Sequence, residues 1–538
     1  MNAARLLVRC LENEGVSHVF GLPGEETLAV NAALEDSQTI TFVLTRHEQG
    51  AAFMADVYGR LSTYPGVCLA TLGPGATNLL TGVADAFLDR APLVAITGQA
   101  GLERVHKESH QYLDVVGMFA PVTKWSARVQ IAETIPEVVR KAFRLARLEK
   151  PGSTHIELPE DVAMEEVDAA PLEVRRTTYP RAIPEAIERA CELIAAAKRP
   201  IVLAGNGVVR RDAAGNGTVA ALRAFVERTG IPAVHTFMAK GVLAPGESAL
   251  ALGPVGLQRP GADLALVPRL AEADVVMCVG YDLVEWAPSL WNPRRDRTVV
   301  HVDSMAAELD GHYQPLVEVV GEIDESLSAL AAKLRPRQES ASPRQARIYH
   351  ASGFPLAPQY VVHALREALG DEDIVVSDVG AHKVWLARLY RATRPNTVII
   401  SNGLASMGIA VPGAIAAKLV RPERKVVAFS GDGGFLMNVQ ELETAKRMRT
   451  AIVCVVLVDG RYGVIEANER RLFGRTFATE FGNPDFVQLA RAFGLPGVAI
   501  ERAEDLVPTL KRALDLDLPA IVAVPVDPAQ NDRIAEPV

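Results

Sequence analysis

A chain of 538 residues is long enough for about three domains of ordinary size. Hydrophobic residues make up 49% of it and charged residues 22%, which is the composition of a globular protein with a large core. The formal net charge is −9 and no run of Lys and Arg occurs, so we expect neither a nucleic-acid partner nor an anionic membrane surface.

The N-terminal segment, residues 1–16, has apolar residues at helical spacing and lacks the apolar core of a secretion signal. No apolar run approaches the roughly 18 residues of a membrane span. The chain has five cysteines, which is an odd number, and no two of them form a CxxC pair. They are Cys10, Cys68, Cys191, Cys278 and Cys454. We therefore expect buried free thiols in a cytoplasmic protein.

Short β-rich segments alternate with helix-length segments along the whole chain. Most are almost continuously apolar, which is typical of parallel strands buried on both faces. The predicted strands are 67–71, 93–97, 201–203, 275–279, 299–302, 374–377, 426–430 and 452–458. The pattern predicts the α/β class, with doubly wound parallel sheets.

Two segments interrupt this alternation. Residues 167–184 are rich in Pro, Arg and Thr, and residues 335–358 are polar and rich in Pro and Ser. Both have the composition of interdomain linkers. They predict three domains, at 1–166, 185–334 and 357–530.

An acidic residue, Glu48, precedes an Ala-rich, helix-forming segment that ends near residue 60. A glutamate at the start of a helix is most often a partner of the helix dipole. The residues alone give no reason to prefer a catalytic role.

A glycine-rich turn, Gly431 to Gly434, follows the predicted strand 426–430 and precedes a helix. Such a turn brings backbone N–H groups and a helix N-terminus close to a ligand, which suits a phosphate. Asp432 within it would repel a phosphate unless a divalent cation lay between them. A tight strand–helix turn with Asp432 as a simple cap is the alternative.

A second predicted strand, 452–458, is followed by Asp459, Gly460 and Arg461. If the two strands are sheet neighbours, Asp432 and Asp459 both lie at carboxyl ends of strands. Doubly wound sheets bind their ligands at that edge.

These residues resemble the metal–diphosphate motif of the thiamine diphosphate enzymes. The resemblance is carried by GDG at 431–433, by Asp459 and by YG at 462–463. It implies that Asp432, Asp459 and the backbone carbonyl of Arg461 hold Mg²⁺. The commoner residue at the second position of the motif is Asn, but Asp459 is an equally good oxygen ligand.

The segment around Glu48, RHE followed by small residues and GR, is similar to the catalytic-glutamate segment of the same family. The resemblance implies that Glu48 hydrogen-bonds N1′ of the cofactor's aminopyrimidine and favours its imino tautomer. The protein would then supply orientation and tautomer control, and the cofactor would supply the chemistry.

Further segments resemble cofactor loops of that family: 20–24 (FGLPG), 73–78 (GPGATN) and 379–382 (VGAH). Met407 matches a bulky residue beneath the cofactor, with core packing as the alternative; His382 could equally be a polar cap. The full set expected at the cofactor is Leu22, Pro23, Gly24, Glu48, Pro74, Asn78, Val379, Gly380, Ala381, His382, Ala405, Met407, Gly431, Asp432, Gly433, Gly434, Asp459, Arg461, Tyr462, Gly463, Val464 and Ile465.

The resemblance covers nearly the whole chain and points to acetolactate synthases of the catabolic, FAD-independent type. It is carried by segments 118–125, 280–292, 301–323 and 523–531. FAD-dependent synthases usually have a different, Arg- and Asp-rich segment at 280–292. GNG at 205–207 lacks the third glycine of a dinucleotide fingerprint, so we expect a Rossmann-like central domain without FAD.

The resemblance implies decarboxylation of pyruvate and ligation to a second pyruvate, giving 2-acetolactate. Gln111 lies where acetolactate synthases carry Gln and pyruvate decarboxylases carry a His pair, which favours ligation. His110 would handle a proton, unless it is an ordinary surface histidine. Val464 stands where Met is usual, and Asn468 stands where biosynthetic enzymes have Trp. The acceptor could therefore be a different or larger molecule than pyruvate.

Two alternatives remain. One is a related carboligase or decarboxylase that acts on another small 2-keto acid. The other is a non-catalytic binding subunit, which the presence of Glu48, Asp432 and Asp459 disfavours. In the family the cofactor lies between the first domain of one subunit and the last domain of another, which implies a homodimer or homotetramer with the active site at the dimer interface.

Overall fold

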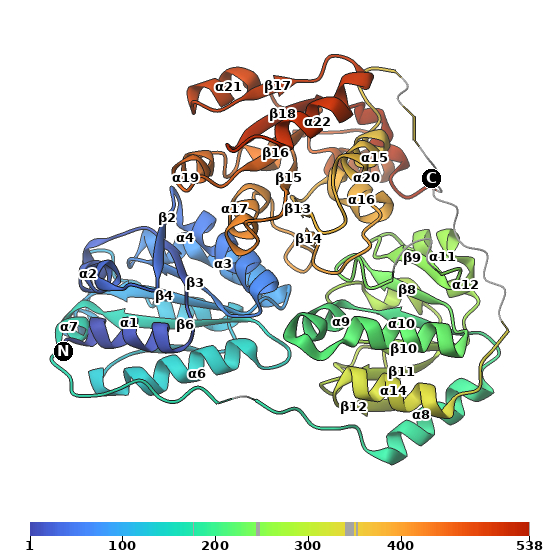
Figure 1. Cartoon of the computed structure of the whole chain (residues 1–538), viewed down its shortest axis with the longest axis horizontal. Helices are drawn as coiled ribbons and strands as arrows, with labels where there is room; N and C mark the ends of the chain where they lie inside the picture. Colours follow the sequence, from blue (N-terminus) through green and yellow to red (C-terminus); the bar gives the residue numbers. More distant parts are fainter. Residues whose placement is uncertain (176, 244–247, 339–348, 351–352, 537–538) are drawn as a thin grey trace.

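The structure is a computed structural model that describes residues 1–175, 177–243, 248–338, 349–350 and 353–536. It has three lobes, each built on one six-stranded sheet with helices on both faces (Figure 1). All strand pairings within the sheets are parallel. The predicted fold class is therefore confirmed.

The N-terminal sheet has the strand order β2-β1-β3-β4-β6-β5. Its strands are β1 (His18–Gly21), β2 (Thr41–Leu44), β3 (Gly66–Ala70), β4 (Leu93–Gln99), β5 (Ser126–Arg128) and β6 (Ser153–Pro159). Its helices are α1 (Ala3–Asn13), α2 (Leu28–Asp36), α3 (Glu48–Ser62), α4 (Pro74–Leu88), α5 (Val115–Phe119), α6 (Ile135–Arg147) and α7 (Glu160–Met164).

The central sheet has the order β12-β11-β10-β7-β8-β9, which is the dinucleotide-fold order 3-2-1-4-5-6 read from the other edge. Its strands are β7 (Pro200–Ala204), β8 (Ala233–Thr236), β9 (Ala251–Val255), β10 (Val275–Val279), β11 (Thr298–Asp303) and β12 (Val317–Val320). Its helices are α8 (Pro184–Ala196), α9 (Asn206–Arg211), α10 (Thr218–Thr229), α11 (Ala262–Leu266), α12 (Pro268–Ala271), α13 (Pro288–Trp291) and α14 (Ile323–Lys333).

The C-terminal sheet, β14-β13-β15-β16-β18-β17, repeats the order of the N-terminal one. Its strands are β13 (Ile374–Ser377), β14 (Val398–Ile400), β15 (Val426–Gly431), β16 (Ile452–Val458), β17 (Gly497–Ala499) and β18 (Ala520–Pro525). Its helices are α15 (Pro358–Ala368), α16 (Ala381–Leu389), α17 (Ala410–Val420), α18 (Asp432–Phe435), α19 (Glu441–Arg447), α20 (Gly463–Phe473), α21 (Phe486–Ala492) and α22 (Leu506–Leu514).

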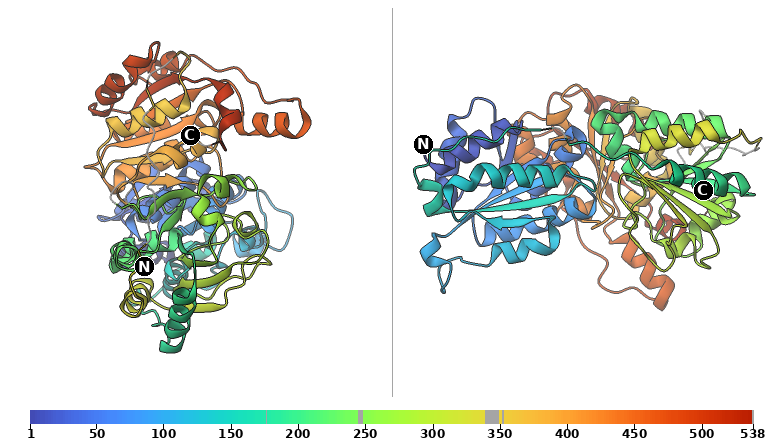
Figure 2. Two further views of the ribbon diagram at one scale, coloured as in Figure 1. Left: turned by 90° about the vertical axis from the view of Figure 1, so that its right-hand side faces the viewer. Right: turned by 90° about the horizontal axis from the view of Figure 1, so that it is seen from below.

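Of the first predicted linker, the described residues 168–175 and 177–183 run as extended chain between the N-terminal and the central domain (Figure 1). In the second predicted linker, residues 339–348 and 351–352 lie outside the described residues. Helix α20 stands away from the body of the molecule (Figure 2). The domain boundaries themselves stay a prediction.

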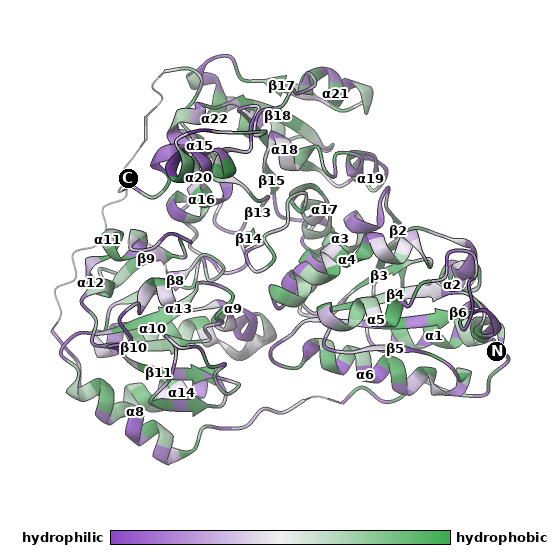
Figure 3. Ribbon diagram, turned by 180° about the vertical axis from the view of Figure 1, so that it is seen from behind, coloured by the Kyte–Doolittle hydropathy of each residue, from purple (hydrophilic) through white to green (hydrophobic). Residues whose placement is uncertain are grey.

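The sheets are apolar and lie beneath helices whose outer faces are polar (Figure 3). Strands such as β3, β7 and β10 are buried at every position, as expected for parallel strands covered on both sides. All five cysteines are buried and free, as predicted. Within the described residues, no helix is long and apolar enough to cross a membrane.

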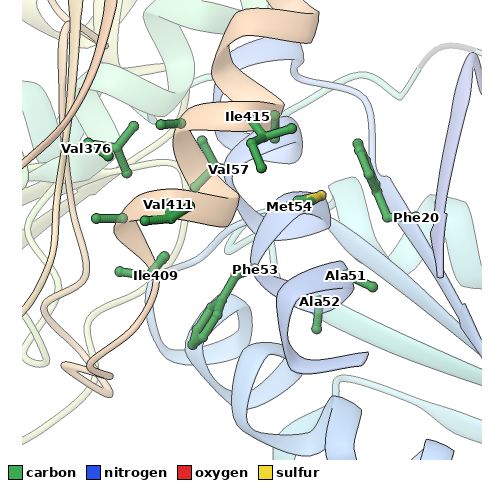
Figure 4. Close-up of a cluster of buried hydrophobic side chains, with 14 of the residues drawn as sticks. Phe20, Ala51, Ala52, Phe53, Met54, Val57, Val376, Ile409, Val411 and Ile415 are labelled. Carbon is green, nitrogen blue, oxygen red and sulfur yellow. The ribbon is translucent and has the colours of Figure 1, made fainter. Parts of the chain in front are cut away.

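The N-terminal and C-terminal domains share one core through helices α3 and α17, which lie side by side (Figure 4). Phe53 and Val57 of α3 face Val411 and Ile415 of α17. A Cβ built at Gly413 of α17 would lie 2.8 Å from Val57 Cγ2. This glycine is therefore needed for the close approach of the two helices, which fixes the two domains relative to each other.

Candidate active site

The strand order of the C-terminal sheet reverses between β13 and β15, and a cavity of about 690 Å³ opens at their carboxyl ends. Ligands of doubly wound sheets bind at such a reversal. Every cofactor residue predicted from this domain lines the cavity: Val379, Gly380, Ala381, His382, Ala405, Met407, Gly431, Asp432, Gly433, Gly434, Asp459, Arg461, Tyr462, Gly463, Val464 and Ile465.

Two carboxylates meet on one wall of this cavity, because β15 and β16 are neighbours in the sheet. Asp432 is buried, and its Oδ2 accepts hydrogen bonds from the backbone N–H of Asp459 at 3.0 Å and of Gly460 at 2.7 Å. Burial, and then the charge of Asp432, raise the pKa of Asp459 to about 6. A cation between the two carboxylates would relieve this repulsion.

A third polar group adjoins the pair and was missed in the sequence. Asn483 donates from Nδ2 to Asp432 Oδ2 at 2.8 Å. Its own Oδ1 is buried and has no hydrogen-bond partner within the described part of the chain. Two carboxylates and a spare amide oxygen are oxygen donors of the kind that Mg²⁺ prefers, so the residues present fit the implied metal. Asn483 is 51 positions from Asp432, and no local pattern in the sequence marks it.

The glycine-rich turn is closely packed, which leaves no room for side chains. A Cβ at Gly434 would lie 2.5 Å from Asp378 Oδ1, and one at Gly433 would lie 2.9 Å from the ring of Tyr462. Opposite the turn, burial lowers the pKa of His382 to about 3, so its ring is neutral. His382 Nε2 is buried without a hydrogen-bond partner in the described part of the chain. A neutral imidazole with a free nitrogen fits a phosphate oxygen better than it fits a polar cap.

Asp378 is a second residue that the sequence did not reveal. It is buried at the end of β13 and accepts hydrogen bonds from the backbone N–H of Gly408 at 2.9 Å and of Ala410 at 3.2 Å. Burial raises the pKa of this carboxyl. Its contacts fix the loop that carries Met407, so Met407 lines the cavity and is not simply core.

The N-terminal domain presents a second group of predicted residues at the matching reversal, between β1 and β3. Glu48 is buried at the start of α3, and its Oε2 accepts a hydrogen bond from Asn78 Nδ2 at 3.0 Å. A Cβ built at Gly75 would lie 3.5 Å from Glu48 Oε1. Glu48 and the GPGATN segment are therefore in contact, which brings Pro74 and Asn78 to the same place.

The first loop and the 110–111 segment adjoin this group. A Cβ at Gly24 would collide with the Thr71 side chain at 2.3 Å, so the loop of Leu22 and Pro23 packs on the end of β3. Gln111 is exposed and has a left-handed backbone, with φ of 58°. It lies against Gly73, whose Cβ would be 2.9 Å from Gln111 Cβ. His110 is exposed, and no hydrogen bond joins its side chain to Glu48 in the described part of the chain, where Glu48 accepts from Asn78.

The two groups do not join within one chain. None of Leu22, Pro23, Gly24, Glu48, Pro74, Asn78, His110 and Gln111 lines the cavity of the C-terminal domain. The N-terminal candidate residues are thus grouped with one another, and the C-terminal ones line a cavity of their own. Within one chain the two groups do not form a single site.

The central domain has a third reversal, between β7 and β10, and protein atoms fill it. A Cβ at Gly207 would lie 2.6 Å from Gly280 Cα. The carboxylate of Glu285 accepts hydrogen bonds from the backbone N–H of Asn206 at 2.9 and 3.0 Å, at the start of α9. Burial, and then the charge of Asp282, raise the pKa of Glu285 to about 7. A carboxylate therefore occupies the position where a dinucleotide fold binds a diphosphate.

Comparison with known proteins agrees with this geometry. Residues 1–118 match the N-terminal TPP binding domain of thiamine pyrophosphate enzymes, residues 187–330 their central domain and residues 378–524 their C-terminal TPP binding domain.

Several curated proteins are similar over nearly their whole length. Acetolactate synthase of Bacillus subtilis (strain 168) is 38% identical over 99% of this chain and 94% of that protein. The catabolic acetolactate synthase of Raoultella terrigena is 37% identical, over 98% of this chain and 96% of that protein. The large subunit of acetolactate synthase isozyme 2 of Escherichia coli (strain K12) is 34% identical, over 99% of this chain and 96% of that protein. The chain belongs to the thiamine pyrophosphate enzyme family, as an acetolactate synthase-like carboligase that uses thiamine diphosphate.

Proposed function

We propose that the enzyme decarboxylates pyruvate and joins the remaining two-carbon unit to a second pyruvate, giving 2-acetolactate, with thiamine diphosphate and Mg²⁺ and without FAD. The observation that carries this proposal is the pair Asp432 and Asp459 at the strand-order reversal, in a cavity lined by every predicted C-terminal cofactor residue. The names of the relatives support the reaction.

Asp432, Asp459 and the carbonyl of Arg461 would hold Mg²⁺, and Asn483 orients Asp432 from behind. The backbone N–H groups of the 431–434 turn and the neutral ring of His382 would bind the diphosphate. Bound thiamine diphosphate would supply the nucleophilic carbon and the electron sink for the electron pair that CO₂ leaves.

Glu48 acts on the other end of the cofactor in this proposal. Its carboxyl group would donate a hydrogen bond to N1′ of the aminopyrimidine and so favour one tautomer, while Asn78 keeps the Glu48 carboxyl in place. Because Glu48 does not line the cavity that contains Asp432, the N-terminal domain of a second copy must complete the site. The active unit is therefore a homodimer or a homotetramer.

Gln111 and His110 lie at the rim of the N-terminal half, beside Gly73. We assign Gln111 to the reacting carbon, where an amide without a titratable proton protects the nucleophile from protonation until the acceptor arrives. His110 would exchange protons with the acceptor oxygen.

The catabolic, FAD-independent subtype is supported by the central domain. Glu285 already accepts the backbone N–H group at the start of α9, so a cofactor diphosphate would have to displace a buried carboxylate. Asp282 beside it is bound by Lys150 and by Arg210. This network takes the place of a flavin nucleotide.

The residues expected to face the acceptor favour one further candidate function, that of a carboligase that acts on another 2-keto acid. Val464 and Asn468 both line the cavity, and Ile465 beside them is 54% exposed. The side chains of Val464 and Asn468 are smaller than the Met and Trp expected for a biosynthetic enzyme, which leaves space for a larger acceptor.

One assay separates these functions. Purified protein is incubated with thiamine diphosphate, Mg²⁺ and pyruvate, and the products are identified. Acetolactate without acetaldehyde supports the proposal. Acetaldehyde alone, or turnover only with another keto acid, would transfer the assignment to the second candidate. No turnover with any keto acid despite bound cofactor would indicate a non-catalytic binding subunit.

A further inference from the structure

A second cavity, of about 660 Å³, lies where the three domains meet, and the proposed reaction makes no use of it. It is bounded by α6 and the end of α3 from the N-terminal domain, by α9 from the central domain and by β14 from the C-terminal domain. Its charged lining is strongly basic: Arg60, Arg90, Arg140, Arg144, Arg147, Arg175, Arg210 and Arg211, against Asp89, Glu149 and Glu322.

Several of these guanidinium groups have unused hydrogen-bonding capacity. Arg144 and Arg147, one turn apart on α6, are exposed and form no ion pair with any described residue. Arg90 has its nearest carboxylate, Asp282, only at 4.0 Å. The Nε atoms of Arg90, Arg210 and Arg211 are buried and have no acceptor in the described part of the chain. Buried donors without acceptors are rare in proteins, and a bound anion is one arrangement that would satisfy them.

The remaining N–H groups of Arg210 and Arg211 have internal partners that hold these side chains in place. Arg210 donates to Asp282 at 3.1 Å, and Arg211 donates to Glu322 at 2.7 Å. Arg211 also lies 4.2 Å from the ring centre of Tyr179. Their orientation is therefore fixed before any ligand arrives, which lowers the entropic cost of binding.

Three lining residues have left-handed backbones: Thr63 with φ of 65°, Arg90 with φ of 59° and Asn396 with φ of 57°. Thr63 ends helix α3 and Asn adopts this region readily, but Arg rarely does, so the backbone at Arg90 is strained. Strain of this kind persists where the surroundings require it, most often at binding sites. The Arg90 guanidinium lies at the boundary between the N-terminal and central domains, 4.0 Å from Asp282.

We propose that this cavity is a binding site for a phosphate anion with two or more negative charges. Planar guanidinium groups with paired N–H donors match phosphate oxygens better than any other side chain. The volume lies within the range of pockets for nucleotide-sized ligands, roughly 300–1,000 Å³. Inorganic diphosphate and a nucleoside diphosphate share this chemistry, and the experiment below distinguishes them.

Such an anion would act on the arrangement of the three domains. The wall from the C-terminal domain is β14 with Asn396, and the loop after β14 carries Ala405 and Met407 of the proposed active site. An anion that draws α6, α9 and β14 together would stabilise the assembled enzyme.

The test is calorimetric titration of the holoenzyme, saturated with thiamine diphosphate and excess Mg²⁺, with inorganic diphosphate and separately with ADP. Saturation excludes binding at the active site. We expect one further site for at least one anion and a rise of a few degrees in unfolding temperature. Binding of both anions identifies the phosphates as the recognised group, and binding of ADP alone identifies a nucleotide.

Variants then locate the site. Arg144→Glu/Arg147→Glu reverses two exposed charges, so the fold is retained, and should weaken binding at least tenfold. Arg228→Glu on α10 is the matched control, because Arg228 is exposed, forms no ion pair with a described residue and lies outside the cavity. No binding of either anion to the holoenzyme, or equal weakening by the double variant and the control, would overturn the proposal.

Discussion

The Asp89 carboxylate of the N-terminal domain accepts a hydrogen bond from the backbone N–H of Asn402, in the C-terminal domain, at 3.0 Å. Its second oxygen accepts from the N–H of Gly403. Arg60 donates to Asp89 at 2.9 Å and to the carbonyl of Ile400 at 3.0 Å. The loop that carries Ala405 and Met407 is thus attached at its start to α3 and α4. The positioning of the proposed cofactor pocket therefore depends on charged residues of another domain.

Arg60 is the cation of this buried cluster, so its removal should be costly. It contacts Asp56, Asp85 and Asp89, whose side chains are fully buried. Arg60→Met leaves their carboxyl groups without a counter-charge, and we expect a loss of about 3–5 kcal/mol in the free energy of unfolding. Urea denaturation followed by circular dichroism measures it. A loss below about 1 kcal/mol would contradict the assigned role.

Asp85→Asn is the matched control in the same cluster. Burial, and then the charges of Asp89 and Asp56, raise the pKa of Asp85 well above its usual value, so replacing its carboxyl group by a neutral amide should cost little. An amide is close to a protonated carboxyl in shape and hydrogen bonding, and it can still accept from Ser401. We expect a change within about 1 kcal/mol.

Glu48→Gln tests the proposed tautomer control. A glutamine can still accept the hydrogen bond from Asn78, so the fold and the dissociation constant for thiamine diphosphate should be nearly unchanged. Loss of the carboxyl proton should lower kcat by about 10²-fold or more. Steady-state kinetics with pyruvate and a cofactor titration measure the two effects. Glu25→Gln, at an exposed site nearby, is the control, and near-wild-type turnover of the Glu48 variant would refute the role.

The sequence was enough to predict that the C-terminal candidate residues lie near one another, because they follow directly after strands. Asp432 follows β15 and Asp459 follows β16, and neighbouring parallel strands bring such positions together. The residues that support them were not predicted. Asn483 reaches Asp432 from a loop far along the chain, and only the folded path of that loop reveals the contact.

The central domain shows a second limit of pattern reading. The absence of a third glycine after GNG at 205–207 suggested that no dinucleotide binds, but it gave no reason for it. The pattern also could not reveal Glu285, whose carboxylate accepts the backbone N–H of Asn206 from 79 positions away, at the place where a dinucleotide fold binds a diphosphate. The parallel, doubly wound class of the sheets, in contrast, followed from their almost continuously apolar segments.

Asp432→Ala tests the proposed metal site. It removes the carboxylate that accepts four hydrogen bonds at the cavity wall, so Mg²⁺-dependent binding of thiamine diphosphate should be lost. Asn483→Ala should weaken the same binding by a smaller factor, about tenfold, since it only orients Asp432. Cofactor titrations at several Mg²⁺ concentrations measure both. Unchanged affinity in the Asp432 variant would remove this residue from the metal site.

Lys240 predicts a pH dependence of stability. It is buried and donates to the carbonyl of Ala387 at the boundary of the central and C-terminal domains, and burial lowers its pKa to about 7. The unfolded chain then binds more protons than the folded one between about pH 7 and the usual lysine pKa near 10.4, and stability should rise with pH in that window. The penalty is fully present below about pH 7.

Comparison with Lys240→Met isolates this contribution from the other titrating groups. The free energy of unfolding of the variant minus that of the wild type should decrease between about pH 7 and about pH 9.5. Lys511→Met, at a side chain that is 52% exposed, should show a flat difference. A flat difference for Lys240→Met as well would show that the buried amine stays charged.

Mixing two inactive variants tests whether the site forms between subunits. Glu48 and Asp432 belong to halves that do not join within one chain, so a hybrid dimer of Glu48→Gln and Asp432→Ala subunits contains one site with both native residues and one with neither. After co-unfolding and refolding, or co-expression, random pairing should restore about a quarter of wild-type activity. Either variant refolded alone is the control and should stay inactive. If both residues served the same site within one chain, every site in the mixture would lack one of them and no activity would return. The outcome thus distinguishes an active site formed between two subunits from one formed within a single chain, without any structure of the assembly.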